Sequence, residues 1–221
     1  MPALPLRRSL AFITAIVAWS ALGLQLVLLV GQMTADGASV VEAVWRFFGF
    51  FTIIMNLMAA VVASALALSP GSAMAGRRSR LVTAAAIVFG GLIYSVLLRA
   101  IWQPIGWQAV ADHALHDATP VLFFLTWLVW DHVGLKWRDA LWAAALPLAY
   151  CGYAFARGAA DGWYAYWFLN PEALNFKQLT ASITLLTAAF LVIAVTLIAI
   201  DRLLAGRDAV RPASQSGSRS L

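Results

Sequence analysis

Charged residues are scarce in this sequence: Asp, Glu, Lys and Arg make up 11% of its 221 residues, whereas 62% are hydrophobic. Soluble domains carry about 25% charged residues, so a chain of this composition cannot keep its apolar surface out of contact with water. Cysteine is almost absent as well. The single Cys151 excludes an intramolecular disulfide and a metal site built from several cysteines. This composition predicts a polytopic membrane protein.

Familiar catalytic patterns are also missing. The chain holds neither the Gly-x-Ser-x-Gly turn of serine hydrolases nor the His-Glu-x-x-His pattern of zinc peptidases. A b-type haem needs histidines on two spans at matching depth, and His113, His116 and His132 do not supply them. We therefore predict no cofactor. Two histidines flanked by Asp112 and Asp117 leave zinc as an alternative, but our prediction there is that no metal binds.

Six apolar runs are candidates for membrane-spanning helices. They cover residues 10–31, 47–68, 81–101, 114–130, 140–156 and 179–200. We expect helices because a lone strand cannot satisfy its backbone polar groups in lipid. The first run is longer than the roughly 7 to 15 apolar residues of a secretory signal, so it is interpreted as a span. The fold class predicted is all-α, with six transmembrane helices and both termini on one side.

The positive charges are unevenly divided between the two sides of this arrangement. Eleven fall on the side of the termini: Arg7, Arg8, Arg77, Arg78, Arg80, Lys136, Arg138, Arg202, Arg207, Arg211 and Arg219. Four fall on the other side: Arg46, Arg99, Arg157 and Lys177. Because cytoplasmic loops hold the excess of Lys and Arg, we predict both termini in the cytoplasm and a location in a bacterial cytoplasmic membrane.

The domain organisation expected is a single six-helix transmembrane domain over residues 1–206. Residues 207–221 are rich in Ser and Arg and poor in apolar residues, which predicts a disordered basic cytoplasmic tail. Such a tail is expected to meet anionic lipid headgroups, and no nucleic-acid partner is predicted.

Polar residues within the spans are few, so each is informative. Thr52 and Asn56 are four residues apart and share a helix face with small residues; these are Gly49, Ala59, Ala60 and Ala63. Small residues allow close helix approach, and Thr and Asn form hydrogen bonds between helices. A purely structural contact and a functional site are both open on this evidence.

The fourth run is short, since only residues 118–130 separate Asp117 from Asp131. A helix of that length covers roughly 20 Å, less than the roughly 30 Å of hydrocarbon. Pro120 lacks the amide that would bond the carbonyl of His116, so we expect an irregular backbone and a polar notch there. His116 and Thr52 can lie at similar depth. His132 lies at the cytoplasmic end and is predicted to be a solvated loop histidine.

An aromatic cluster precedes the last run, over residues 162–168. Such clusters anchor proteins at the membrane interface, and this one is also a candidate lid or mouth for an entering lipid. Trp163 and Tyr164 are the substrate-binding candidates.

Four segments together resemble the androgen-induced-gene family of multi-pass membrane proteins, in its bacterial branch labelled Pr-six-Pr. They are Phe50-Phe51-Thr52-Ile53-Ile54-Met55-Asn56, residues 113–120, residues 137–150 with Pro147 and Tyr150, and residues 157–168. Eukaryotic members are similar to atypical threonine hydrolases that cleave fatty-acid esters of hydroxy fatty acids. The resemblance implies Thr52 as nucleophile and His116 as base, with His113 as the neighbouring alternative.

The function implied is an integral-membrane hydrolase of lipid esters, with a membrane lipid as its partner. Thr52 would attack the ester carbonyl, and His116 would take the hydroxyl proton. Asn56 is a candidate oxyanion donor or orienting residue, and Asp112 or Asp117 a candidate to hold the imidazole tautomer. Two other classes remain open: a non-catalytic lipid-binding or transport protein with a polar intramembrane core, and a structural membrane subunit.

Overall fold

A computed structural model describes residues 3–132 and 134–209, and all regular secondary structure in those ranges is helical. The elements are α1 Leu4–Ala35, α2 Val40–Phe47, α3 Phe51–Leu68, η1 Ala73–Ala75, α4 Arg77–Ile93, η2 Tyr94–Leu98, α5 Gly106–His113, η3 Ala114–Ala118, α6 Thr119–Val129, α7 Asp139–Asp161, η4 Trp167–Leu169 and α8 Phe176–Ala209. Here η1 and η4 are 3₁₀-helices, whereas η2 and η3 are π-helical turns. The prediction of an all-helical chain is confirmed, while most of the predicted tail, residues 210–221, lies outside the described residues.

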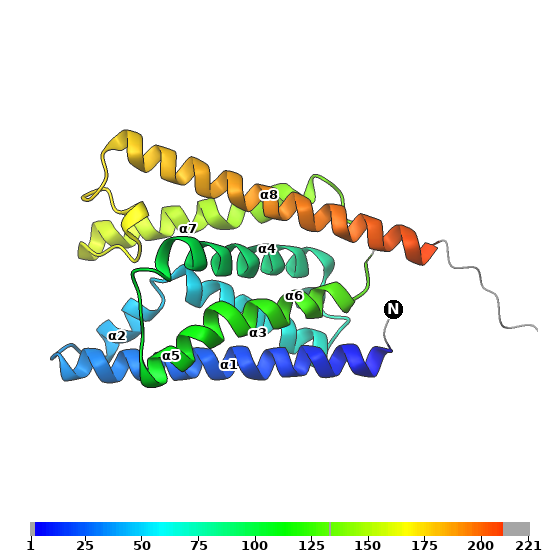
Figure 1. Ribbon diagram of the computed structural model, residues 1–221, viewed down its shortest axis with the longest axis horizontal. Coiled ribbons are helices and arrows are strands. Elements are labelled where there is room, and N and C mark those ends of the chain that lie inside the picture. The colour runs from blue at the N-terminus through cyan, green and yellow to red at the C-terminus, as the bar shows by residue number, and fades with distance from the viewer. Residues whose placement is uncertain (1–2, 133, 210–221) are drawn as a thin grey trace, which may run out of the picture.

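The long helices lie side by side in a bundle with α4 at its centre (Figure 1). Helix α4 contacts α3, α6, α7 and α8, while α1 packs along α3 and also contacts α6. Helices α7 and α8 form a pair on the opposite side of α4. Fully buried side chains from four helices meet in the core; they include Met55, Ile87, Phe123 and Phe190. Helix α1 begins and α8 ends at the same end of the bundle (Figure 1).

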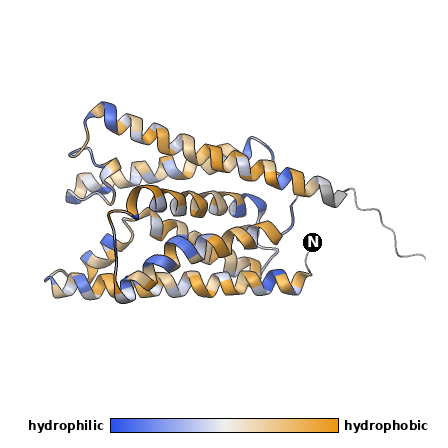
Figure 2. Ribbon diagram, viewed as in Figure 1, coloured by the Kyte–Doolittle hydropathy of each residue, from blue (hydrophilic) through white to orange (hydrophobic). Residues whose placement is uncertain are grey.

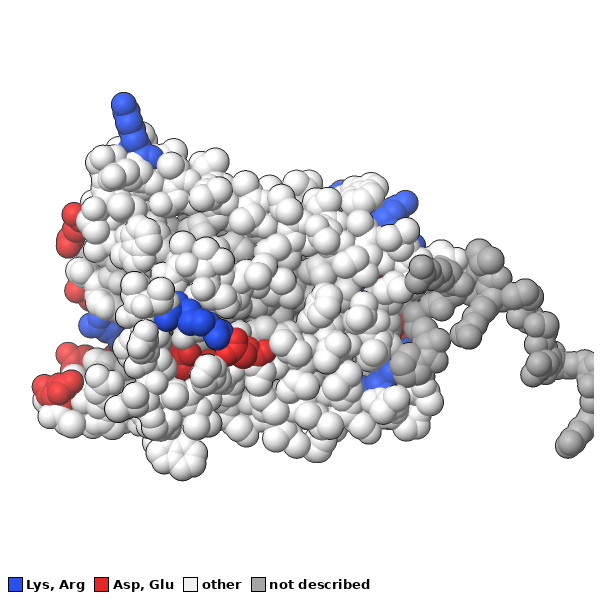
Figure 3. Space-filling view, in the orientation of Figure 1, with Lys and Arg blue, Asp and Glu red and all other residues white. Residues whose placement is uncertain are grey.

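Four of the described helices are long and apolar enough to cross a membrane: Leu4–Ala35, Phe51–Leu68, Arg77–Leu98 and Phe176–Gly206. Hydrophobic residues cover most of the length of the bundle (Figure 2). On the face shown in Figure 3, most charged side chains lie near the two ends, and one group of basic and acidic side chains extends to about the middle of the face. This surface is compatible with a membrane protein. The count of six spans stays a prediction, because the runs at 114–130 and 140–156 are not among these four helices.

Helix α3 begins later than the sequence predicted, and Gly49 accounts for the difference. A Cβ atom at Gly49 would lie 2.6 Å from the ring of Trp163, and the Gly49 carbonyl accepts a hydrogen bond from the Tyr150 hydroxyl at 2.9 Å. The chain therefore turns between α2 and α3, and Phe50 becomes the N-cap. Thr52 consequently lies in the first turn of α3, where backbone amides have no partner within the helix.

The irregular backbone predicted around Pro120 is confirmed, because a π-helical turn joins α5 to α6 there. Proline offers no N–H to the carbonyl of His116, so the regular hydrogen-bond ladder is interrupted. Helix α4 comes close to this turn: a Cβ atom at Gly91 would lie 3.2 Å from that carbonyl oxygen. Glycine at position 91 thus allows α4 to support the turn that carries His116.

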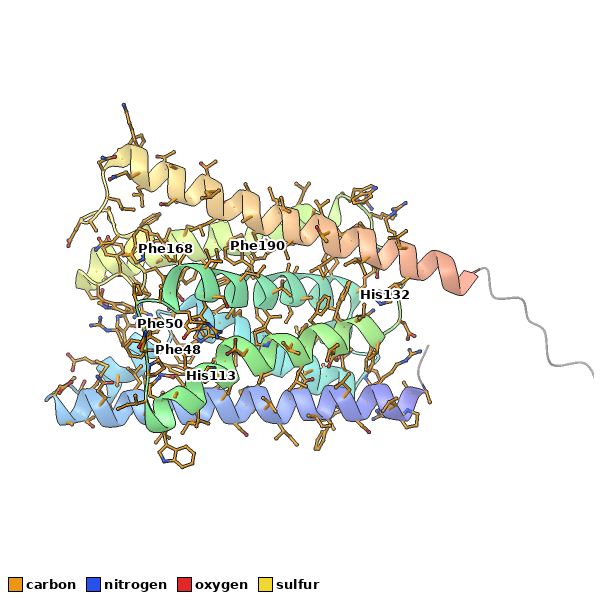
Figure 4. The ribbon with its side chains drawn as sticks, viewed as in Figure 1. Phe48, Phe50, His113, His132, Phe168 and Phe190 are labelled. Carbon is orange, nitrogen blue, oxygen red and sulfur yellow. The ribbon has the colours of Figure 1, made fainter. Side chains whose placement is uncertain are left out.

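The prediction for His132 was wrong, since its side chain is buried rather than solvated. Only 8% of the residue is exposed, its Nδ1 lies 2.9 Å from a carboxylate oxygen of Asp201, and its Nε2 lies 3.0 Å from the Leu128 carbonyl. Helix α8 brings Asp201 over the loop, which the sequence spacing did not reveal. Figure 4 shows His132 just beyond the end of α6, far from His113 at the junction of α5 and η3.

Candidate functional site

Thr52 and His116 meet in the structure although 64 residues separate them. The Thr52 hydroxyl oxygen, in the first turn of α3, lies 3.2 Å from Nε2 of His116 in η3. This is the distance at which a base accepts a hydroxyl proton. The two residues that the sequence selected by depth are therefore hydrogen-bonded partners, and their pairing needs both the late start of α3 and the π turn.

Asp112 lies behind His116, one helical turn earlier. Nδ1 of His116 lies 3.1 Å from the Asp112 carbonyl oxygen and 3.3 Å from its carboxylate. Both neighbours are hydrogen-bond acceptors, so the imidazole proton belongs on Nδ1 and the lone pair of Nε2 faces Thr52. The His116 and Asp112 side chains are only 10% and 5% exposed. Thr52, His116 and Asp112 thus form a hydroxyl–imidazole–carboxylate chain with the connectivity of a catalytic triad.

Tyr94 contacts both His116 and Asp112 in this hydroxyl–imidazole–carboxylate chain, and the sequence did not reveal it. Its ring stacks on the imidazole of His116 with centroids 3.7 Å apart and planes inclined by 10°. Its hydroxyl donates a hydrogen bond to the Asp112 carboxylate. Tyr94 opens the π turn η2, so two π turns face each other at this site, and π turns inside α-helices are frequent at functional sites.

Tyr166 is the second residue that the sequence did not single out. Its hydroxyl lies 3.4 Å from the Thr52 hydroxyl and accepts a hydrogen bond of 3.3 Å from the Thr52 backbone N–H. Stacking on Phe168, at 5.1 Å between centroids, holds the ring in place. Its only sequence signal was membership of the aromatic cluster. The Thr52 amide thus holds the Tyr166 hydroxyl beside the Thr52 hydroxyl oxygen.

Asn56 joins α3 to η3 rather than facing a ligand. Its amide nitrogen donates to the carbonyl oxygens of Thr52 at 2.8 Å and Leu115 at 3.2 Å. Both of its N–H bonds are used in this way, so its geometry favours the orienting role over oxyanion donation. Its Oδ1 has no hydrogen-bond partner among the described residues.

His113 and Asp117 lie to one side of the Thr52 pair. The His113 side chain is 66% exposed, and its Nδ1 lies 2.7 Å from the Asp117 carboxylate. Asp117 also forms an ion pair with Arg99. The two histidines thus contact different carboxylates, and no group of three or more His, Cys, Asp and Glu side chains within the described ranges is arranged to hold a metal ion.

Trp163 and Tyr164 pack at the end of the bundle opposite to the start of α1. The Trp163 ring lies beneath the Arg46 guanidinium, 4.1 Å away, and edge-on to Phe50. Tyr164 lies against Gly158, where a Cβ atom would come within 2.2 Å of its ring. Neither residue contributes to the cleft beside Thr52, which receives Tyr166 from the same segment.

A narrow apolar cleft of about 50 Å³ opens next to Thr52. Residues of α3, α4, η2, α7, η4 and α8 line it, together with Tyr166 just before η4; they include Phe51, Thr52, Phe89, Gly90, Tyr94, Tyr150, Cys151, Tyr166, Phe168 and Leu186. The polar groups thus stand at the wall of an otherwise hydrophobic space, the arrangement typical of small-ligand sites.

Comparison of the chain with protein-family models, with curated proteins and with solved structures gave no match. The geometry of this site is therefore what indicates a function.

Proposed function

We propose that the protein is a membrane-embedded hydrolase of lipid esters, in which Thr52 is the nucleophile and His116 the general base. The observation that carries this proposal is the 3.2 Å contact between the Thr52 hydroxyl and Nε2 of His116. A hydroxyl becomes a competent nucleophile when a base is within hydrogen-bond reach and a third group orients that base. Asp112 supplies the orienting group.

The reaction proceeds in two acyl transfers. The Thr52 oxygen attacks the ester carbonyl carbon while Nε2 of His116 takes the hydroxyl proton. The tetrahedral intermediate collapses, the C–O bond to the alcohol breaks, and His116 returns its proton to the departing oxygen. Water then attacks the acyl-threonine, with His116 again taking a proton, and the carboxylic acid leaves as Thr52 is reprotonated.

The charge that develops on the carbonyl oxygen needs donors placed in advance. We assign this role to the Tyr166 hydroxyl, which lies 3.4 Å from the Thr52 hydroxyl. The Thr52 backbone N–H belongs to the first turn of α3 and has no partner within the helix, so it donates to the Tyr166 oxygen at 3.3 Å and holds that hydroxyl in place. Tyr94 and Asp112 hold the imidazole and stabilise its protonated form.

The membrane setting is part of the proposal. We place six spans across a bacterial cytoplasmic membrane with both termini in the cytoplasm, following the excess of Lys and Arg on the side of the termini. A lipid ester can then reach Thr52 laterally from the bilayer. Membership of the androgen-induced-gene family is proposed on the four segments that resemble it.

Labelling with a fluorophosphonate, which phosphorylates activated hydroxyls, tests the proposal. We expect the purified protein in detergent to be labelled, and Thr52→Val and His116→Ala to lose labelling. Two matched controls should keep it: Thr196→Ala, whose hydroxyl only bonds its own helix, and His113→Ala, which lies away from Thr52.

Loss of labelling in His113→Ala but not in His116→Ala would reassign the base. A folded wild-type protein that is neither labelled nor able to hydrolyse an ester would refute catalysis, and the polar cluster would then belong to a lipid-binding or transport protein.

A further inference from the structure

The cleft beside Thr52 is almost entirely apolar, although the polar cluster of the site adjoins it. Apart from Thr52 and the tyrosines, its lining consists of hydrocarbon, glycine and the thiol of Cys151. Its far wall comes from α7 and α8, on the side of α4 away from α1. Such a lining offers no partner for a polar headgroup and favours a hydrocarbon chain.

The placement of the base decides which end of an ester occupies this cleft. His116 must reach the departing alcohol oxygen to return its proton, yet His116 is not part of the cleft lining, whereas Tyr166 is. The alcohol therefore departs on the side of His116, and the substituent on the carbonyl carbon extends past Tyr166 into the cleft.

We infer that this cleft is the acyl-chain subsite, and that it holds the first carbons of an unbranched acyl chain. The identification of the acyl end rests on the proposed hydrolase function. A buried water needs about 10–15 Å³ of free volume, so about 50 Å³ accommodates roughly four groups of methylene size. Longer chains continue out of the cleft into lipid.

Substrate chain length provides the first measurement, with p-nitrophenyl esters and the full-length protein in detergent. We expect kcat/KM to rise about twofold to fourfold for each methylene added between acetate and butyrate, and to level off by octanoate. Leu186→Trp, which fills the cleft, should lower kcat/KM for butyrate and octanoate about tenfold more than kcat/KM for acetate. Leu185→Trp is the matched control, because Leu185 is 71% exposed on the same helix.

Modification of Cys151 provides a second measurement that does not require catalysis. Cys151 is the single cysteine of the chain and lines the cleft, so its reaction with methyl methanethiosulfonate reports occupancy. Octanoate, an acid product of the proposed reaction, should slow this modification in the wild type and in Leu185→Trp but not in Leu186→Trp.

The two measurements separate this inference from the proposed function. Protection of Cys151 by octanoate in a protein that hydrolyses no ester would support the cleft as an acyl-chain site and overturn the hydrolase. Hydrolysis without protection, or an equal loss of acetate and butyrate hydrolysis in Leu186→Trp, would overturn the acyl subsite.

Discussion

Replacing Tyr166 by phenylalanine removes one hydroxyl and tests the proposed oxyanion donor directly. The aromatic contact with Phe168 involves only the ring, so we expect the fold to persist. Loss of one oxyanion donor costs about a hundredfold to a thousandfold in kcat, and the lower value applies here because the Tyr166 hydroxyl lies 3.3 Å and 3.4 Å from the two Thr52 atoms. We expect kcat to fall about a hundredfold, or ~2.7 kcal/mol, with KM nearly unchanged.

The assay is hydrolysis of p-nitrophenyl butyrate, with thermal unfolding measured on the same samples. Tyr153→Phe is the control, because the Tyr153 hydroxyl donates to the Phe48 carbonyl at 3.0 Å and has no contact with Thr52. Loss of this hydrogen bond should lower the free energy of unfolding by about 1 kcal/mol and leave kcat unchanged. A kcat for Tyr166→Phe within threefold of the wild type, in a protein of unchanged stability, would refute our reasoning about the oxyanion.

Three further predictions follow from other contacts. Asp112→Asn should lower kcat roughly ten- to a hundredfold, less than the roughly 10⁴-fold loss known for an orienting aspartate, because the Asp112 backbone carbonyl still accepts the imidazole proton; fluorophosphonate labelling rates will show it. Gly90→Ala should lower the free energy of unfolding by about 1–3 kcal/mol, because the added Cβ would lie 1.9 Å from the Met55 sulfur. Gly152→Ala is the control, since a Cβ atom there would meet no neighbouring side chain within 4 Å. Denaturant titrations should show destabilisation in the first variant and not in the second. A hydrogen bond from the Trp45 indole lowers the pKa of Asp161. The ionised carboxylate therefore stabilises the fold above the ordinary aspartate pKa of about 3.9, and this stabilisation is lost as pH falls through the lowered pKa. The difference in melting temperature between the wild type and Asp161→Asn should accordingly disappear in acid.

The sequence predicted an all-helical chain correctly because long apolar runs have few structural solutions in lipid. It also selected Thr52 and His116, since polar residues in such runs are rare and their depth can be counted along a helix. Tyr94 and Tyr166 escaped because a tyrosine in an apolar segment is ordinary. Their roles depend on stacking and hydrogen bonds between helices distant in sequence, which no local spacing encodes.

The two errors arose from contacts between segments that are distant in sequence. Helix α3 begins four residues after the apolar run does, because Gly49 lets the chain turn against Trp163. His132 appeared solvated because its partner, Asp201, is 69 residues away on α8. Packing between helices decides both features. The number of spans, their orientation and the family remain predictions.

The π turn at Ala114–Ala118 also bears on how such a site could arise. A π turn winds one more residue into a helix than a regular turn does. Deleting Ala118 would remove this extra residue and swing His116 by about 100° around the helix axis relative to α6, away from Thr52. In evolutionary terms, one inserted codon in a membrane helix changes which neighbouring helix a histidine faces.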